Sequence, residues 1–244
     1  MLYLVGLGIW DENDVSLRGV ECCKRADKVY CELYTAAWGG DLEKLGKTIG
    51  KKIEPLERAD VEERSHKLIE EAKAKNVALL VPGDPLTATT HVHLIMECKD
   101  KKVAFEVVHS SSIYTTVAKT GLQLYKFGRA ATVITPKKGY ESSGFYDTIV
   151  ENQKLGLHTL LLLDRDMGTM QALEILRKTE ARKKRKVLKH AVICSELGSE
   201  NERMIYGKVD SLLRIDLPPP AVVIVPGKLH FLEREFLETL DTVK

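Results

Sequence analysis

A stiff turn that directly follows an apolar strand constrains the fold of this chain more than any other feature. Residues 77–81 (Val-Ala-Leu-Leu-Val) are all apolar, which predicts a buried strand. Pro82-Gly83-Asp84-Pro85 comes next, and two prolines around a Gly-Asp pair predict a sharp turn that ends the strand. The threonines that follow, at 87, 89 and 90, can cap and open a helix. Open α/β sheets bind ligands at such loops, outside the carboxyl ends of their strands; the alternative is a plain connecting turn.

The first half of the chain alternates strand-like and helical patterns, which predicts an α/β domain with mainly parallel strands. The expected strands cover residues 2–5, 28–33, 77–81 and 103–108, and the expected helices cover 15–26, 61–75, 91–99 and 113–120. Gly121 is predicted to end the last of these helices as a C-cap.

The boundary to a second domain is expected at Lys126-Phe127-Gly128, so that the domains cover residues 1–127 and 128–244. Its strands are predicted at 131–135, 159–163, 191–195, 204–208 and 221–225, and its helices at 145–155, 169–184 and 231–240. Because strands become denser late in the chain, a mixed and partly antiparallel sheet is expected there.

The bulk composition is that of an ordinary globular protein of 244 residues, with 44% hydrophobic residues and a net charge of +2. The five cysteines form no C-x-x-C pair, and their odd number speaks against a disulfide framework. We expect a reduced, cytoplasmic setting. The chain opens on a strand rather than a basic and then apolar leader, and no apolar run has the length that spans a bilayer.

Other motifs point less clearly to a site. Gly6-Leu7-Gly8 begins like a dinucleotide fingerprint, but Asp11 stands at the sixth position and Glu32 lies beyond the usual spacing for a ribose-binding acid. These glycines are expected to let a loop pass close to a ligand. His91 and His93 are two apart and point to different faces of a helix, so we expect no metal site.

Six blocks, taken together, resemble the tetrapyrrole-methylase-like (class III) methyltransferases. They lie in order at residues 2–8, 82–91, 109–114, 121–128, 156–164 and 226–230. The resemblance implies two α/β domains with the cofactor, S-adenosyl-L-methionine, in the cleft between them. It also implies cofactor contacts at Ile9, Asp84, Thr87, Ser112, Ile113, Leu163, Tyr206 and His230.

Local alternatives exist for several of these residues. Asp84 can form an Asx-turn with its own backbone, Ser112 can cap a helix, and His230 stands where a capping histidine is equally expected. Met204 can take the place of Tyr206. No dyad or triad stands out, and we assign no catalytic residue.

The resemblance implies a protein substrate, translation elongation factor 2. The reaction is repeated methylation of the amine of its 3-amino-3-carboxypropyl-histidine to give diphthine. The short connection at 165–168 suits the members that stop at three methyl groups, and the family implies a homodimer. The apolar residues Leu33, Tyr34, Ala36, Ala37 and Trp38 add little to the homodimer expectation, because they can equally be core. The alternatives are methylation of a tetrapyrrole or other small molecule, and a binding module without enzyme activity.

A basic run covers residues 177–190. It contains Arg177, Lys178, Arg182, Lys183, Lys184, Arg185, Lys186 and Lys189, against Glu180 alone. A solvated helix end, stabilised by the helix dipole, is the usual explanation for such a run. A docking surface for an acidic or ribosome-associated partner is the alternative.

Overall fold

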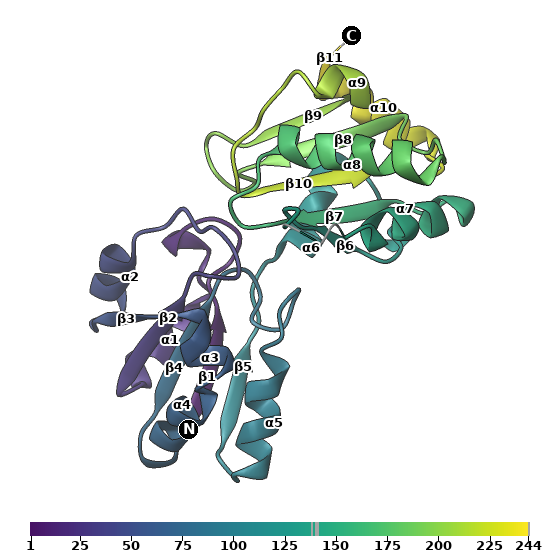
Figure 1. Ribbon diagram of the computed structural model, residues 1–244. Coiled ribbons are helices and arrows are strands. Elements are labelled where there is room, and N and C mark those ends of the chain that lie inside the picture. Colours follow the sequence, from purple (N-terminus) through teal and green to yellow (C-terminus); the bar gives the residue numbers. More distant parts are fainter. Residues whose placement is uncertain (138, 140–141, 244) are drawn as a thin grey trace. The chain divides into compact units, whose positions relative to one another are not determined.

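The computed structural model describes residues 1–137, 139 and 142–243. The chain divides into two compact units, Met1–Thr116 and Val117–Lys244, each built around its own sheet (Figure 1). The predicted class, two α/β domains, is confirmed. No helix of the described residues is long and apolar enough to cross a membrane.

Unit 1 holds a five-stranded sheet of order β3-β2-β4-β1-β5 in which every pairing is parallel, in agreement with the predicted mainly parallel strands. Its strands are β1 (Leu2–Gly6), β2 (Lys28–Glu32), β3 (Ile53–Leu56), β4 (Val77–Val81) and β5 (Phe105–Val108). β1 and β4 are buried along their whole length, as expected for strands covered on both faces.

Helices cover both faces of this sheet. α1 (Leu17–Arg25) and α2 (Leu42–Ile49) pack on one face, and α4 (Ser65–Ala74) and α5 (Val92–Asp100) pack on the other. The alternation along β1 explains this arrangement, because Tyr3 and Val5 join the first cluster while Leu2 and Leu4 join the second. α3 (Arg58–Glu62) and the 3-10 helix η1 (Glu12–Asp14) are short additions.

The chain leaves β1 and β4 toward opposite faces of the sheet. β1 leads into α1 on one face and β4 leads into α5 on the other, although the two strands are neighbours. Such a divergence is the topological switch point at which open α/β sheets bind ligands. The turn singled out in the sequence, at residues 82–85, lies at this point.

Unit 2 holds a six-stranded sheet of order β11-β9-β8-β10-β7-β6. Its strands are β6 (Ala131–Val133), β7 (Thr159–Leu163), β8 (His190–Ser195), β9 (Arg203–Lys208), β10 (Ala221–Val225) and β11 (Asp241–Val243). β10 is antiparallel to β7 and to β8, and β8 is antiparallel to β9. The predicted mixed sheet is therefore confirmed.

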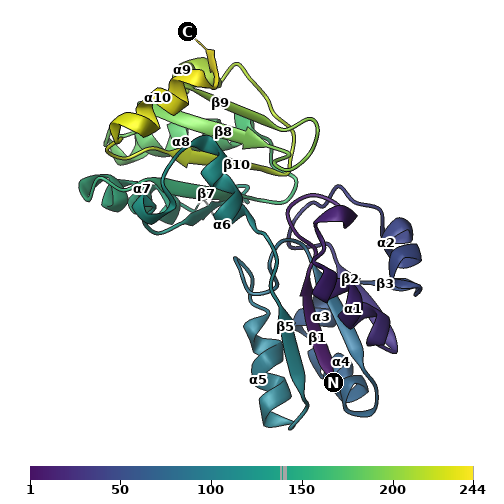
Figure 2. The same ribbon diagram turned by 180° about the vertical axis from the view of Figure 1, so that it is seen from behind.

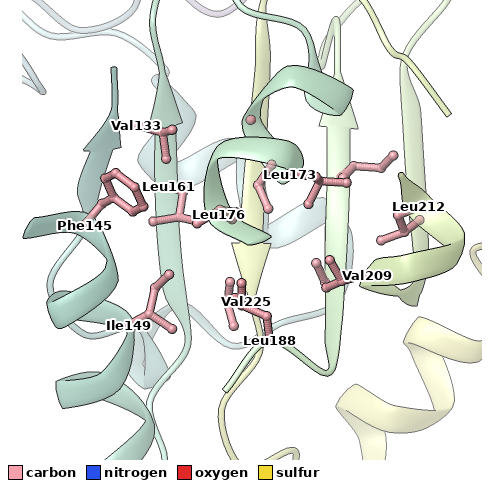
Figure 3. Packing of buried hydrophobic residues seen from close by; sticks show 14 of the residues in the cluster. Val133, Phe145, Ile149, Leu161, Leu173, Leu176, Leu188, Val209, Leu212 and Val225 are labelled. Atoms are coloured by element: carbon pink, nitrogen blue, oxygen red, sulfur yellow. The ribbon is translucent and has the colours of Figure 1, made fainter. Parts of the chain in front are cut away.

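One face of this sheet carries the larger core. α7 (Gly144–Lys154), α8 (Thr169–Lys183) and α9 (Val209–Leu212) pack there, and Figure 3 shows Leu161, Leu173 and Leu176 meeting between strand and helix. α10 (Phe231–Thr239) lies over the opposite face and buries Leu237 (Figure 2).

The two units divide at Thr116–Val117, earlier in the chain than the boundary expected after Phe127. α6 (Ile113–Thr116) ends unit 1, and the 3-10 helices η2 (Val117–Thr120) and η3 (Leu124–Lys126) belong to unit 2. They belong there because Leu122 is buried and Gln123 N–H donates to the Glu233 carboxylate.

The single helix expected at 61–75 is in fact two helices, α3 and α4. The backbone N–H of Arg64 donates to the Ala59 carbonyl, and its guanidinium pairs with Asp60 at 2.8 Å, so the chain turns here instead of continuing. α2, β3, α9 and β11 were not expected. All five cysteines are unpaired, buried thiols.

The core of unit 2 allows a direct test. Leu161 is fully buried on β7 between α7 and α8, so truncating it leaves a cavity. We expect Leu161→Ala to lower the free energy of unfolding by about 2–5 kcal/mol in a urea titration. Leu155→Ala, at a side chain that is 75% exposed, is the control and is expected to change it by less than about 0.5 kcal/mol.

Candidate functional site

Loops from three adjacent strands meet at the carboxyl edge of the unit 1 sheet. Leu7-Gly8 follows Gly6 at the end of β1, Pro82-Gly83-Asp84-Pro85 follows β4, and His109-Ser110-Ser111-Ser112 follows β5. Because the strands are ordered β4-β1-β5 and run parallel, the three loops leave the same edge side by side.

Backbone pairing joins the first two loops. Gly8 and Gly83 form an isolated bridge in which Gly83 N–H donates to the Gly8 carbonyl at 2.8 Å, and the reverse bond measures 3.2 Å. Both glycines have positive φ, of +82° and +69°, which side-chain-bearing residues rarely adopt. A Cβ at Gly6 would lie 2.5 Å from the Gly83 carbonyl oxygen and 2.7 Å from Ser110 Cβ. The three loops therefore pack closely, backbone against backbone, in an arrangement that a side chain at Gly6 would prevent and that we call the cradle.

The Asp84 carboxylate joins the second and third loops. Its Oδ1 accepts from Leu86 N–H at 3.0 Å and from the Thr87 hydroxyl at 3.1 Å, which is the Asx-turn alternative realised. Its Oδ2 accepts from His109 Nδ1 at 2.7 Å and from Ser110 N–H at 3.2 Å. Asp84 is only 7% exposed, so it acts as a bracket between the loops.

Asp84 stays ionised within this bracket. Burial raises its pKa, but the hydrogen bonds from Leu86 N–H, His109 and Ser110 N–H outweigh burial and hold the pKa below its ordinary value. Because an ionised carboxylate can only accept, His109 Nδ1 is the donor in its hydrogen bond with Asp84.

The expected contact residues of unit 1 lie around this cradle. Ile9 directly follows the Gly8 bridge, and Thr87 lies on the Asp84 turn. Ser112 is buried, and its Cβ lies 3.9 Å from the position that a Cβ on Gly83 would take. Ser112 also precedes α6: its carbonyl accepts from Thr115 and Thr116, and its N–H donates to Thr115 Oγ1 at 3.3 Å. Ile113 begins that helix.

A buried polar cluster, not expected from the sequence, lies beside the cradle. Glu32 ends β2 and accepts from Tyr34 N–H and from Thr35, while the Tyr34 hydroxyl lies 3.2 Å from His91 Nε2. Burial raises the pKa of Glu32 and lowers that of His91 to about 4. Within the turn-bearing loop, Thr89 Oγ1 is buried without a hydrogen-bond partner, while the Pro85 backbone hydrogen-bonds the His91 ring. Unpaired polar atoms of this kind mark places where a ligand or water is required.

In unit 2 the structure separates Leu163 from Tyr206. Across the sheet, Tyr206 on β9 pairs with Val192 on β8, and Val192 pairs with Ile224 on β10. Ile224 in turn pairs with Leu160 on β7. Tyr206 is therefore level with Leu160, and Leu163 lies three residues farther along β7. That is about 10 Å along the strands. Leu163 packs on the face covered by α7 and α8, whereas Tyr206 alternates with the core residue Ile205 and points to the other face.

His230 also lies at the far edge from Leu163, because β10 is antiparallel to β7. It is the N-cap of α10: its Nδ1 accepts from Leu232 N–H at 3.4 Å, and its own N–H donates to Glu233 at 2.7 Å. The capping role that the sequence left open is therefore present. The structure does not bring Leu163 together with Tyr206 and His230.

Glu233 is the centre of a buried network that holds this end of α10. Its carboxylate accepts from Gln123 N–H at 3.0 Å, from His158 Nε2 at 3.0 Å, and from the Lys126 ammonium. His158 Nδ1 accepts from Gly227 N–H at 2.9 Å, so the imidazole is neutral with its proton on Nε2. Burial lowers the pKa of His158, in agreement with that tautomer.

This chain is similar to known proteins along nearly its whole length. The family described as tetrapyrrole (corrin/porphyrin) methylases matches residues 1–213. A protein of Methanocaldococcus jannaschii named diphthine synthase is 42% identical over 98% of both chains, and one of Methanococcus aeolicus with the same name is 41% identical over the same shares. A crystal structure of diphthine synthase superposes with a TM-score of 0.91 at 39% identity, covering 98% of this chain and 95% of that one. A putative diphthine synthase from Entamoeba histolytica gives 0.92 at 32% identity, covering 100% and 99%.

The Glu233 network predicts a dependence of stability on pH. Burial raises the pKa of Glu233, but Lys126, the N–H groups of Gln123 and His230, and His158 lower it from 4.5 to about 2. Because the folded-state pKa lies below the unfolded one, the stabilisation is complete above pH 4.5 and is lost as the pH falls toward 2. It amounts to about 3 kcal/mol.

We expect Glu233→Gln to lower the free energy of unfolding at pH 7 and to flatten its slope between pH 4.5 and 2, measured by urea titration at several pH values. Glu235→Gln changes an exposed carboxylate of the same helix and is the control, expected to keep the slope. An unchanged slope in Glu233→Gln would contradict the assignment.

Proposed function

This chain belongs to the tetrapyrrole methylase family and is a methyltransferase, and from that premise we propose that it methylates translation elongation factor 2. The proposal names S-adenosyl-L-methionine as methyl donor. The acceptor is the amine of the 3-amino-3-carboxypropyl group on a histidine, and the product is diphthine. The observation that carries the proposal is full-length similarity, above 40% identity, to relatives named diphthine synthase.

The cradle of unit 1 fits the proposed cofactor. It offers the backbone of Gly83, where an added Cβ would meet nothing closer than Ser112 Cβ at 3.9 Å, and the buried Thr89 hydroxyl, which lacks a partner. S-adenosyl-L-methionine supplies a methyl group bound to a sulfonium sulfur. When the methyl group is transferred, the rest of the cofactor leaves as a neutral thioether. The residues proposed to hold it are Ile9, Asp84, Thr87, Ser112 and Ile113.

We leave Tyr206 and His230 out of the proposed cofactor site. They lie at the opposite edge of the unit 2 sheet from Leu163, and His230 is engaged as a helix cap. Leu163 stays a prediction, as does the homodimer.

The chain's own contribution is positioning. Asp84, with four hydrogen bonds, fixes two loops relative to each other, and the Gly8–Gly83 bridge fixes the third. Holding the amine in line with the methyl carbon supplies several kcal/mol of the barrier without acid–base chemistry. The amine must lose a proton before each transfer, and a dry pocket favours its neutral form.

Three methyl groups are the proposed end point. A quaternary ammonium has no lone pair, so a fourth methyl would have to go to the weakly nucleophilic carboxylate, which needs a separate orientation of the substrate. The 165–168 connection adds no segment that would hold the substrate in that second way. It is short and ordered, since Asp164 accepts from Thr135 N–H and Met167 is buried.

A labelled-methyl assay tests the proposed function. We expect transfer from S-adenosyl-L-methionine to precursor-modified elongation factor 2, with an added mass of three methyl groups after exhaustive reaction. Unmodified elongation factor 2 and a uroporphyrinogen are the controls and are expected to accept none. Transfer to the uroporphyrinogen alone would overturn the substrate, and a stable product with four methyl groups, one of them lost in mild base, would overturn the end point.

The cofactor site is tested by Asp84→Asn. The amide keeps the size of the side chain, but only one of its two terminal atoms can accept a hydrogen bond. Either the bond from Leu86 N–H or the bond from Ser110 N–H is therefore lost. We expect affinity for S-adenosyl-L-methionine, measured by calorimetry, to fall about tenfold or more. Asp100→Asn, at an exposed residue of α5, is the control and is expected to bind as the parent does. Unchanged affinity in Asp84→Asn would place the cofactor elsewhere.

A further inference from the structure

Unit 2 has a pocket at the edge where β8 begins and where β9 and β10 end. Its volume is about 400 Å³, a size that suits a few side chains or a small ligand. It is lined by Gln153, Lys186, Val187, Lys189, His190, Tyr206, Pro226, Gly227 and Leu229. Tyr206, unused by the proposed cofactor site, lies in its wall.

The basic run supplies the cations of this pocket. Its last part, between α8 and β8, is a loop held by hydrogen bonds and not only a frayed helix end. The buried Glu180 carboxylate accepts from Val187 N–H at 2.8 Å and from Leu188 N–H at 2.9 Å, and it pairs with Arg177 at 2.6 Å. Gln153 donates to the Val187 carbonyl at 3.1 Å. Leu188 is buried beside Val225 and Val209, as Figure 3 shows.

Glu180 is ionised in this arrangement. Burial raises its pKa, but the N–H groups of Leu188 and Val187, together with Arg177 and Tyr146, hold it below its ordinary value. The one carboxylate in the basic run is thus bonded within the run itself, to the N–H groups of Val187 and Leu188 and to Arg177. Lys186 and Lys189, on either side of the anchored Leu188, are exposed.

The pocket combines positive charge with an aromatic wall. No carboxylate of the described chain forms an ion pair with Lys186 or Lys189. His190 stacks on Tyr206, with ring centroids 5.6 Å apart and an angle of 27° between the planes. Burial and the ammonium groups of Lys208 and Lys189 lower the pKa of His190, so its ring is neutral at pH 7. Val187, Pro226 and Leu229 add apolar surface.

We propose that this pocket and the exposed cations around it dock an acidic, partly apolar segment of the protein substrate. Two unpaired ammonium groups suit carboxylates, and the Tyr206–His190 stack with its apolar neighbours suits the side chains between them. A protein rather than a nucleic acid is favoured because the positive charge is local: the whole chain is only +2, far from the basic balance of nucleic-acid-binding domains. The inference rests on the proposed function for the identity of the substrate.

The test reverses the two charges with Lys186→Glu and Lys189→Glu together, and Tyr206→Ala is a second variant. Lys67→Glu with Lys99→Glu, at exposed lysines of α4 and α5, is the control with the same change of net charge. Affinity for precursor-modified elongation factor 2 is measured by biolayer interferometry at two salt concentrations, beside kcat, KM and calorimetric affinity for S-adenosyl-L-methionine.

We expect the Lys186/Lys189 variant to bind elongation factor 2 at least tenfold more weakly and to raise KM by a similar factor. Its kcat at saturation and its cofactor affinity should stay unchanged, and its binding should depend less on salt than that of the parent. Tyr206→Ala is expected to weaken binding in the same sense, and the control pair is expected to match the parent.

Equal affinity of the parent and the Lys186/Lys189 variant for elongation factor 2 would overturn the inference. If that variant at the same time loses binding of a 20-nucleotide RNA, the surface is assigned to nucleic acid. Failure of the proposed function is seen separately, in a parent enzyme that neither binds nor methylates elongation factor 2.

Discussion

The Asp84 carboxylate is the interaction on which the candidate site depends. It joins the turn after β4 to the loop after β5 through bonds on both of its oxygens, and the Gly8–Gly83 bridge adds the loop after β1. Each loop alone is short. Tied together at a switch point of a parallel sheet, they form a rigid floor whose geometry is set by the strands. The absence of side chains at Gly6, Gly8 and Gly83 allows the loops to approach this closely.

The same device occurs twice in unit 2. Glu233 fixes the start of α10 to the segment before β6, and Glu180 fixes the loop between α8 and β8. In each case a buried carboxylate is stabilised mainly by backbone N–H groups and by one cation, so its desolvation is offset by bonds that also order the chain. Removing one partner would leave a buried charge unsatisfied, which costs more than the bonds contribute net. These carboxylates therefore specify loop conformation and, while ionised, also add to the stability of the fold.

The sequence predicted the strands of both sheets well because apolar runs such as 77–81 and 159–163 are continuous and are bounded by turns. The sequence did not predict β3 because Pro55 interrupts a strand of only four residues at the sheet edge. The sequence pattern does not tell that β10 runs against β7, so it could not show that residues after these two strands lie at opposite edges of the sheet. The hydrogen bonds of Glu180 and Glu233 join residues from separate elements, and periodicity carries no signal for them.

Under the proposed function, the arrangement around Asp84 favours one of two ways in which this residue would assist methyl transfer. A free carboxylate near a sulfonium would stabilise the cofactor's positive charge and so favour the reactant, because that charge is lost from sulfur as the methyl leaves. In this chain both oxygens accept from donors, and part of the negative charge is already compensated. Electrostatic stabilisation of the reactant is thereby reduced, while the fixed loop geometry is kept. Positioning, which aligns nucleophile and methyl carbon without stabilising the starting charge, is the larger effect in a site built this way.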